Sequence, residues 1–151
     1  MRISDLETPV PVIDLDRVEA NLKKMQSYCD AHGHIKTHKI PAFAHRQIEL
    51  GAAGITCQKV SEAEVMARAG MDDILISYPM VGVGKAQRLG EVAKLAKLRV
   101  AVDSSEALNT VGDAARISGA TIGVLVEFDS GAKRTGVTSV AEALTLAQRV
   151  I

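Results

Sequence analysis

The feature that most constrains the fold is a repeated unit, a short apolar run followed by an amphipathic helical pattern. Near-continuous apolar strands that alternate with helices predict a parallel sheet with right-handed crossovers. The sequence therefore predicts an α/β fold, favoured as a partial (β/α)8 barrel, and periodicity alone leaves a doubly wound sheet open. The predicted strands are Gly54–Val60, Asp73–Pro79, Leu98–Asp103 and Ile122–Asp129, and the predicted helices are Ser61–Ala69, Gly84–Lys97, Ser105–Ser118 and Thr138–Ile151.

The N-terminal third is less regular. A short β-type run covers Val10–Leu15, and Asp16 is expected to cap a helix that continues to about Asp30. A buried strand fits after that helix only if it continues into Lys36–His38, and Pro41 suits the first turn of the next helix. Counted together, these segments predict about five parallel βα units.

Composition bounds the function classes. The chain has 151 residues, 47% of them hydrophobic, with 18 basic and 18 acidic side chains, which is typical of one globular domain. Aromatic residues are only 3% and the charge is balanced, so nucleic-acid binding is not expected. Cys29 and Cys57 fit neither a metal motif nor a disulfide framework, and no apolar run is long enough for a membrane span. A cytoplasmic protein is the expectation.

The segment His34–Pro41, HIKTHKIP, is the strongest candidate for chemistry. A lysine buried at the end of a strand loses solvation of its charged form, so its pKa falls and its amine becomes a nucleophile. Lys36 in that position would suit a Schiff base. The alternative is that Lys36 and Lys39 are ordinary solvated lysines in a loop.

Polar residues follow each predicted strand, where active sites of parallel α/β folds lie. Together they could hold an anionic cofactor. Structural roles are the alternative: Ser61, in a capping box with Glu64, and Ser105 are expected to cap helices, and Asp103 could begin a turn. The set is Lys36, His38, Gln58, Lys59, Ser77, Tyr78, Asp103, Ser104, Asp129 and Arg134.

Competing motifs fail on inspection. PMVGVGKA, at Pro79–Ala86, has proline where a phosphate loop needs its first glycine, and Ala86 where it needs Ser or Thr. It also lacks the third glycine of a dinucleotide fingerprint, so an NAD-type sheet protein is disfavoured. His34 and His38 have a metal-ligand spacing only on a helix, and the flanking residues favour extended structure. No metal site within this chain is predicted.

Five segments, taken in order, resemble the N-terminal part of the D-threonine aldolase and D-serine dehydratase group. These are pyridoxal-phosphate enzymes of the alanine racemase barrel type. The resemblance covers nearly the whole chain, and the ordered series is more specific than any one motif. The segments are TPVPVIDLDRVEANLKKM, IKTHKIP, GAAGITCQKVSEAEVMARAG, DDILISYPMVG and VLVEFDSGAKRTGV.

The resemblance implies roles for four residues. Lys36, the first lysine of the family's K-T-H-K segment, would carry the cofactor as a Schiff base, and Arg134 would lie by the cofactor ring. His38 and Gln58 fall in matching segments beside the cofactor, and His38 is taken with Lys36 as catalytic. The implied reaction is retro-aldol cleavage of a β-hydroxy-D-amino acid to glycine and an aldehyde. Dehydration, as in D-serine dehydratase, is the alternative. A divalent metal is implied, with ligands beyond this chain.

Two departures from the family pattern shape the domain prediction. The segment before Lys36 reads AHGHIK and is shorter than the family's strand there. The chain ends at Ile151, whereas such a barrel needs about 250 residues. Residues 1–151 are therefore predicted to be a truncated barrel domain whose C-terminal β domain is absent. The second hypothesis is a non-catalytic cofactor carrier, or an assembly piece that completes its barrel with a partner chain. The expected protein partner is a second copy in a homodimer or a complementing C-terminal chain.

Overall fold

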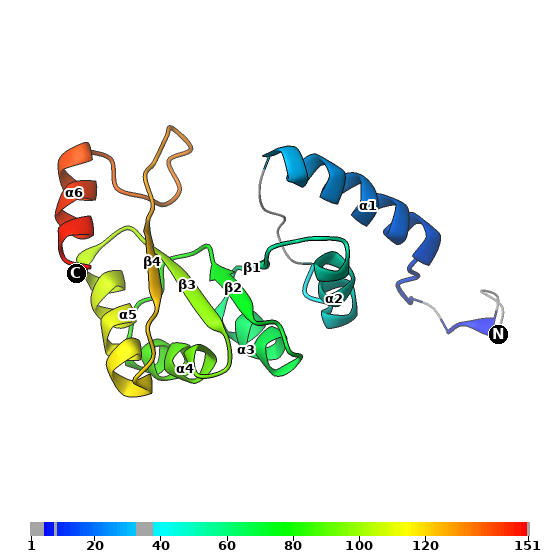
Figure 1. The fold of residues 1–151 in the computed structure, drawn as a ribbon, viewed down its shortest axis with the longest axis horizontal. Helices are drawn as coiled ribbons and strands as arrows, with labels where there is room; N and C mark the ends of the chain where they lie inside the picture. Colours follow the sequence, from blue (N-terminus) through cyan, green and yellow to red (C-terminus); the bar gives the residue numbers. More distant parts are fainter. Residues whose placement is uncertain (1–4, 8, 33–37, 151) are drawn as a thin grey trace.

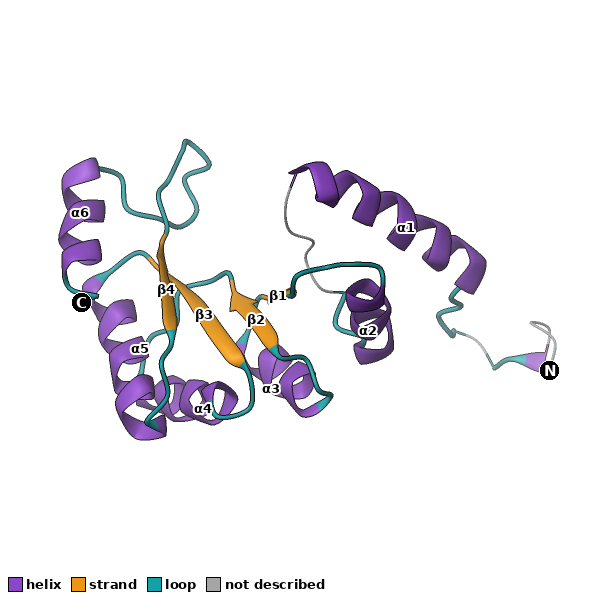
Figure 2. Ribbon diagram, in the orientation of Figure 1, coloured by secondary structure: helices purple, strands orange, loops and turns teal. Residues whose placement is uncertain are grey.

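The computed structural model describes residues 5–7, 9–32 and 38–150 of the chain. Its four described strands are parallel and lie in the order β1-β2-β3-β4 (Figure 2). The strands are β1 Ile55–Cys57, β2 Asp73–Ile76, β3 Lys97–Val102 and β4 Gly123–Val126. The helices are α1 Leu15–His32, α2 Pro41–Glu49, α3 Val60–Arg68, α4 Val83–Ala93, α5 Ser105–Ser118 and α6 Val140–Gln148.

Helices α3, α4 and α5 form a row along one side of the sheet (Figure 1). Side chains alternate between the two faces of a strand, so every second strand residue points to these helices. Ile74, Ile76 and Leu98 are at most 1% exposed and pack with Leu89 and Val92 of α4. The hydrophobic core thus lies between the sheet and this row of helices.

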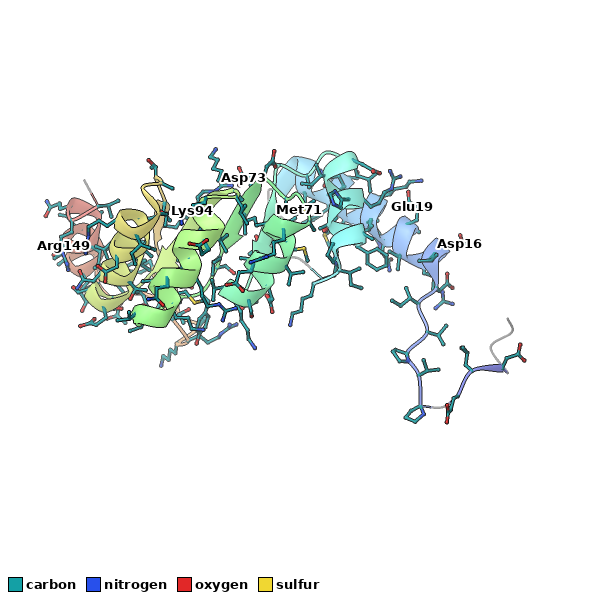
Figure 3. The ribbon with its side chains drawn as sticks, turned by 90° about the horizontal axis from the view of Figure 1, so that it is seen from below. Asp16, Glu19, Met71, Asp73, Lys94 and Arg149 are labelled. Carbon is teal, nitrogen blue, oxygen red and sulfur yellow. The ribbon has the colours of Figure 1, made fainter. Side chains whose placement is uncertain are left out.

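The other face of the sheet carries charged side chains near the N-terminal ends of its strands. Asp73 of β2 and Arg99 of β3 form an ion pair there (Asp73 is labelled in Figure 3). Gly123 of β4 leaves room for it, because a Cβ at this position would lie 2.8 Å from Cγ of Arg99. Leu125, on the same face, is 42% exposed. Within the described part of the chain, this face is much less covered than the helix side.

The strand order decides between the two predicted architectures. In a doubly wound sheet the order of strands reverses at a switch point, whereas in a barrel each strand lies beside its predecessor. The four described strands follow the barrel order without a reversal. The predicted partial TIM-type barrel is therefore confirmed. The strand expected before Pro41 falls largely on residues outside those described, and His38 lies in a loop.

The predicted strand at Val10–Leu15 is wrong. Residues 10–14 are irregular, and Leu15 already begins α1. Val12 is 58% exposed, and no described strand lies alongside this segment to accept its hydrogen bonds. The cap also differs, because Oδ1 of Asp14 accepts the backbone N–H of Arg17 at 3.1 Å, while Asp16 lies inside the first turn.

Two predicted helix caps are also wrong by a residue or more. Ser104 caps α5 by accepting the backbone N–H of Ala107, and Ser105 is the first helical residue. Helix α3 begins at Val60, so Ser61 lies inside it, and no side chain caps this helix. The predicted capping-box partner, Glu64, instead pairs with Arg88 of α4. A glutamate at this spacing can serve either as a local cap or as the partner of a residue on another helix, and the spacing alone does not tell which.

Helix α1 is attached to α2 through an ion pair. The carboxylate of Glu19 accepts hydrogen bonds from Nε and Nη2 of Arg46, at 3.0 and 2.5 Å (Glu19 is labelled in Figure 3). Arg46, and after it Lys23, lower the pKa of Glu19 from 4.5 to about 2. A lowered folded-state pKa contributes stability above the unfolded value, and this is lost as pH falls towards the folded value.

We expect Glu19→Gln to lower the melting temperature at neutral pH, and this difference from the unmodified chain to shrink as pH falls from 4.5 to about 2. Thermal unfolding followed by circular dichroism over that pH range measures the effect. Glu49→Gln is the matched control, since Glu49 also pairs with Arg46 but lies on α2 itself. A Glu19→Gln effect that is the same at every pH would contradict the ion-pair explanation.

Candidate functional site

Four polar side chains follow the four described strands. Gln58 follows β1, Ser77 follows β2, Asp103 follows β3 and Glu127 follows β4. Because the strands are parallel, these residues lie at one edge of the sheet, and alternation places them on the face away from α3, α4 and α5. Nε2 of Gln58 lies 3.4 Å from Oγ of Ser77, so the first two are neighbours.

The loop after β4 is shaped by Asp129. Its carboxylate accepts the backbone N–H groups of Gly131 at 2.9 Å and Lys133 at 3.0 Å. These bonds, that of Lys133 first, hold the pKa of Asp129 below its usual value. Asp129 is therefore an ionised organiser of the loop, and its oxygens are already occupied by the backbone. It is not suited to proton transfer.

Gly136 closes the same loop against the sheet. Its backbone N–H donates to Oδ2 of Asp103 at 3.2 Å, and its φ of 105° lies in the region that favours glycine. A Cβ here would lie 2.6 Å from the backbone nitrogen of Asp129. This close approach returns the chain to the end of β3. Arg134, two residues earlier, is thereby held near the strand ends.

Two neighbouring cavities open at these strand ends. One, of about 270 Å³, is lined by Ser77, Tyr78, Glu127 and Arg134 among others. The second, of about 510 Å³, is lined by Gln58 and Lys59 and shares Tyr78 with the first. The larger one is within the usual size range of small-molecule sites, about 300 to 1,000 Å³, and the smaller one is just below it.

The smaller cavity contains a guanidinium and a carboxylate that are only partly paired. Arg134 is exposed and forms no ion pair with any residue that the structure describes. Oε1 of Glu127 accepts the hydroxyl of Thr135 at 2.8 Å, while Oε2 is buried and has no donor among the described residues. The guanidinium thus remains available for an electron-rich or anionic group.

His38 lines neither cavity, and its ring contacts α2. Its Nε2 lies 2.9 Å from Oε1 of Gln47, and its Nδ1 accepts the backbone N–H of Ile40 at 3.2 Å. Its ring also meets Phe43 edge-on, with centroids 5.2 Å apart. Lys36, the predicted nucleophile, lies outside the described residues.

The alanine racemase N-terminal domain family matches residues 13–151. The chain belongs to this family. It is 46% identical to a D-threonine aldolase of an Arthrobacter species over 152 residues, covering 97% of this chain and 40% of that protein.

Solved structures of this alanine racemase-type family share the fold. The D-threonine aldolase of Filomicrobium marinum has a TM-score of 0.88 at 40% identity, over 97% of this chain and 41% of that one. The D-threo-3-hydroxyaspartate dehydratase of Delftia sp. HT23 has a TM-score of 0.74 at 32% identity, over 96% of this chain and 40% of that one. The chain thus spans about 40% of the length of these relatives.

The structure brings together two of the residues predicted for the alanine racemase-type site. Gln58 and Arg134 line the adjoining cavities, and His38 does not. Sequence reasoning missed Glu127, whose signal was an acidic residue directly after the apolar run of β4. Burial raises the pKa of the Cys57 thiol to about 12, so this cysteine is not a nucleophile at neutral pH.

Among the residues that the structure describes, no three His, Cys, Asp or Glu side chains come together in a way that could bind a metal ion. No helix in the described ranges has both the length and the apolar character needed to cross a membrane.

Proposed function

We propose that this chain is the cofactor-binding part of a pyridoxal-phosphate-dependent lyase that cleaves β-hydroxy-D-amino acids, as a D-threonine aldolase does. The observation that carries the proposal is the Arg134 guanidinium, unpaired within the described residues, in a cavity that adjoins the one lined by Gln58. The 46% identity to a protein named D-threonine aldolase supports the choice of reaction.

The residues at the strand ends fit the cofactor. Pyridoxal phosphate is anionic and its ring carries polar substituents, and the two cavities offer a guanidinium, an amide and the hydroxyls of Ser77 and Tyr78. When bound, the cofactor supplies an electron sink for the bond that breaks at the substrate's α carbon. Lys36 is the residue that would hold it, through its side-chain amine.

The chain's own side chains have separate proposed tasks. Arg134 would orient the ring and hold positive charge beside it, and its position is set by the loop that Asp129 organises. Gln58 would donate from its amide while Ser77 fixes that amide's orientation, 3.4 Å away.

Dehydration of the same substrate class is the second candidate. The similarity to D-threo-3-hydroxyaspartate dehydratase, with a TM-score of 0.74, supports it, and the higher TM-score of 0.88 with a D-threonine aldolase favours cleavage. A divalent metal that binds the substrate hydroxyl, a cytoplasmic location, and assembly as a homodimer or with a complementing chain belong to the same proposal.

The test is to mix the chain with pyridoxal phosphate, reduce with borohydride and locate the adduct by mass spectrometry. We expect a single adduct on Lys36 and none in Lys36→Ala. Lys39→Arg is the matched control, because arginine forms no such adduct and keeps a positive charge opposite Glu62, whose Oε1 lies 3.2 Å from Nζ of Lys39. Assays with D-threonine and D-serine, with added Mn²⁺ or Mg²⁺, then separate cleavage from dehydration. Failure of the unmodified chain to form the adduct, or equal labelling of Lys36→Ala, would overturn the proposal.

A further inference from the structure

We propose that His38 is a positioning residue that fastens the Lys36 segment to α2, in place of the catalytic role that was predicted for it from the sequence. The inference deepens the proposed function, since it rests on Lys36 as the cofactor lysine. It is carried by the contacts of His38 and of the residue that follows it.

Both ring nitrogens of His38 are occupied. A backbone N–H can only donate, so Nδ1, which accepts the N–H of Ile40 at 3.2 Å, carries no proton. The hydrogen is then on Nε2, which donates to Oε1 of Gln47 at 2.9 Å. The ring is thus held as one neutral tautomer, and to exchange a proton with a substrate it would have to break one of these bonds.

The residue on α2 that accepts this hydrogen bond is buried. Gln47 is 4% exposed, and Ala44, on the same helix, is fully buried in the core. Phe43 adds an edge-on ring contact to His38, with an interplanar angle of 75°. A buried amide oxygen that lost its donor would be left unsatisfied, which is costly. The hydrogen bond to Gln47 therefore favours one position of the His38 imidazole.

The next residue fastens the chain on the other side. Nζ of Lys39 lies 3.2 Å from Oε1 of Glu62, and the carboxylate of Glu62 also accepts the backbone N–H of Gln58 at 2.9 Å. Lys39 has a φ of 70°, which a non-glycine residue adopts only where its surroundings impose it. The bond from Ile40 to His38 closes the turn around this strained residue.

Two consecutive residues are thus attached to different parts of the fold. His38 is bound to α2, and Lys39 is bound to Glu62 at the start of α3, which is itself joined to the end of β1. Lys36 is two residues before His38, a distance that extended chain spans in at most about 7 Å. Holding His38 in place therefore limits the positions from which the side chain of Lys36 can reach the strand ends.

A double-mutant cycle between His38 and Gln47 tests the inference. Its readouts are the rate at which borohydride fixes pyridoxal phosphate on Lys36 and, without any cofactor, the rate at which acetic anhydride acetylates Lys36. We expect His38→Ala and Gln47→Ala each to change both rates by roughly tenfold, and the double variant to be no worse than either one. Melting temperatures establish that each variant is folded.

Two further measurements separate positioning from proton transfer. The ¹⁵N shifts of the His38 ring should show the Nε2–H tautomer at neutral pH. His38→Gln should recover much of the labelling rate, since its amide can still donate to Gln47 although it cannot carry a proton. An Nδ1–H tautomer would overturn the inference. So would a Gln47→Ala variant that is labelled on Lys36 at the full rate beside a His38→Gln variant that is not labelled. If the unmodified chain forms no adduct, the proposed function fails, while the tautomer and the acetylation cycle still decide the role of His38.

Discussion

Replacing Gly136 with alanine is expected to destabilise the chain by about 2 to 4 kcal/mol, because the substitution adds backbone strain and a steric overlap. A side chain at a φ of 105° is strained, and its Cβ would lie 2.6 Å from the nitrogen of Asp129 and 2.8 Å from the carbonyl carbon of Phe128. Neither neighbour can move alone, since the N–H of Asp129 is bonded to the carbonyl of Val137 at 2.9 Å. Urea unfolding measures the loss.

Gly131→Ala is the matched control for this prediction. Gly131 lies in the same loop with a φ of 118°, but a Cβ there would meet nothing within 4 Å. We expect Gly131→Ala to show the strain alone, and Gly136→Ala to show a clearly larger loss together with faster hydrogen exchange at Asp129 and Val137. Equal losses in both variants would mean that the close approach of Gly136 to the strand end contributes nothing.

This loop shows what sequence reasoning could and could not supply. The resemblance selected the segment and Arg134, and the structure places Arg134 on a cavity at the predicted edge of the sheet. Asp129 was predicted as one more polar candidate for the site only because it lies at the end of a predicted strand. Its task became clear only when its carboxylate was found to accept two backbone N–H groups of its own loop.

The regular elements were predictable because their cause is local. Periods of two and 3.6 residues decide which side chains can face a common core, and the predicted helix Ser105–Ser118 agrees with the observed one at both ends. The strand predicted at Val10–Leu15 failed because strand formation also needs a neighbour, and the described part of the chain provides none. Periodicity carries no information about such a neighbour.

The ion pair of Asp73 and Arg99 could not be predicted from the sequence, for a related reason. These residues come from different strands, and the pairing depends on register: Asp73 lies opposite Lys97, so Arg99 must reach diagonally towards it. The space for that reach comes from Gly123 on a third strand. No single segment contains this arrangement.

The face of the sheet that packs against the helices is expected to carry most of the stability. Leu98→Ala should destabilise the chain by about 3 to 5 kcal/mol, because it leaves a cavity in a close-packed core. Leu98 is 1% exposed and packs among the helix residues of the main core. Since domains of this size are stable by only about 5 to 15 kcal/mol, the variant should lose a large share of its stability in urea or thermal unfolding.

Leu125→Ala makes the same chemical change on the opposite face of the same sheet. Leu125 is 42% exposed, so its truncation should cost about 1 kcal/mol or less. The ratio of the stability losses of Leu125→Ala and Leu98→Ala measures how far this second face is covered in solution. Truncating a half-exposed leucine causes a large loss of stability only when another surface packs on it. A Leu125→Ala loss that approaches that of Leu98→Ala, and that grows with protein concentration, would show that copies of the chain bury this face against each other. A large loss that is independent of concentration would contradict the one-sided core described for the single chain.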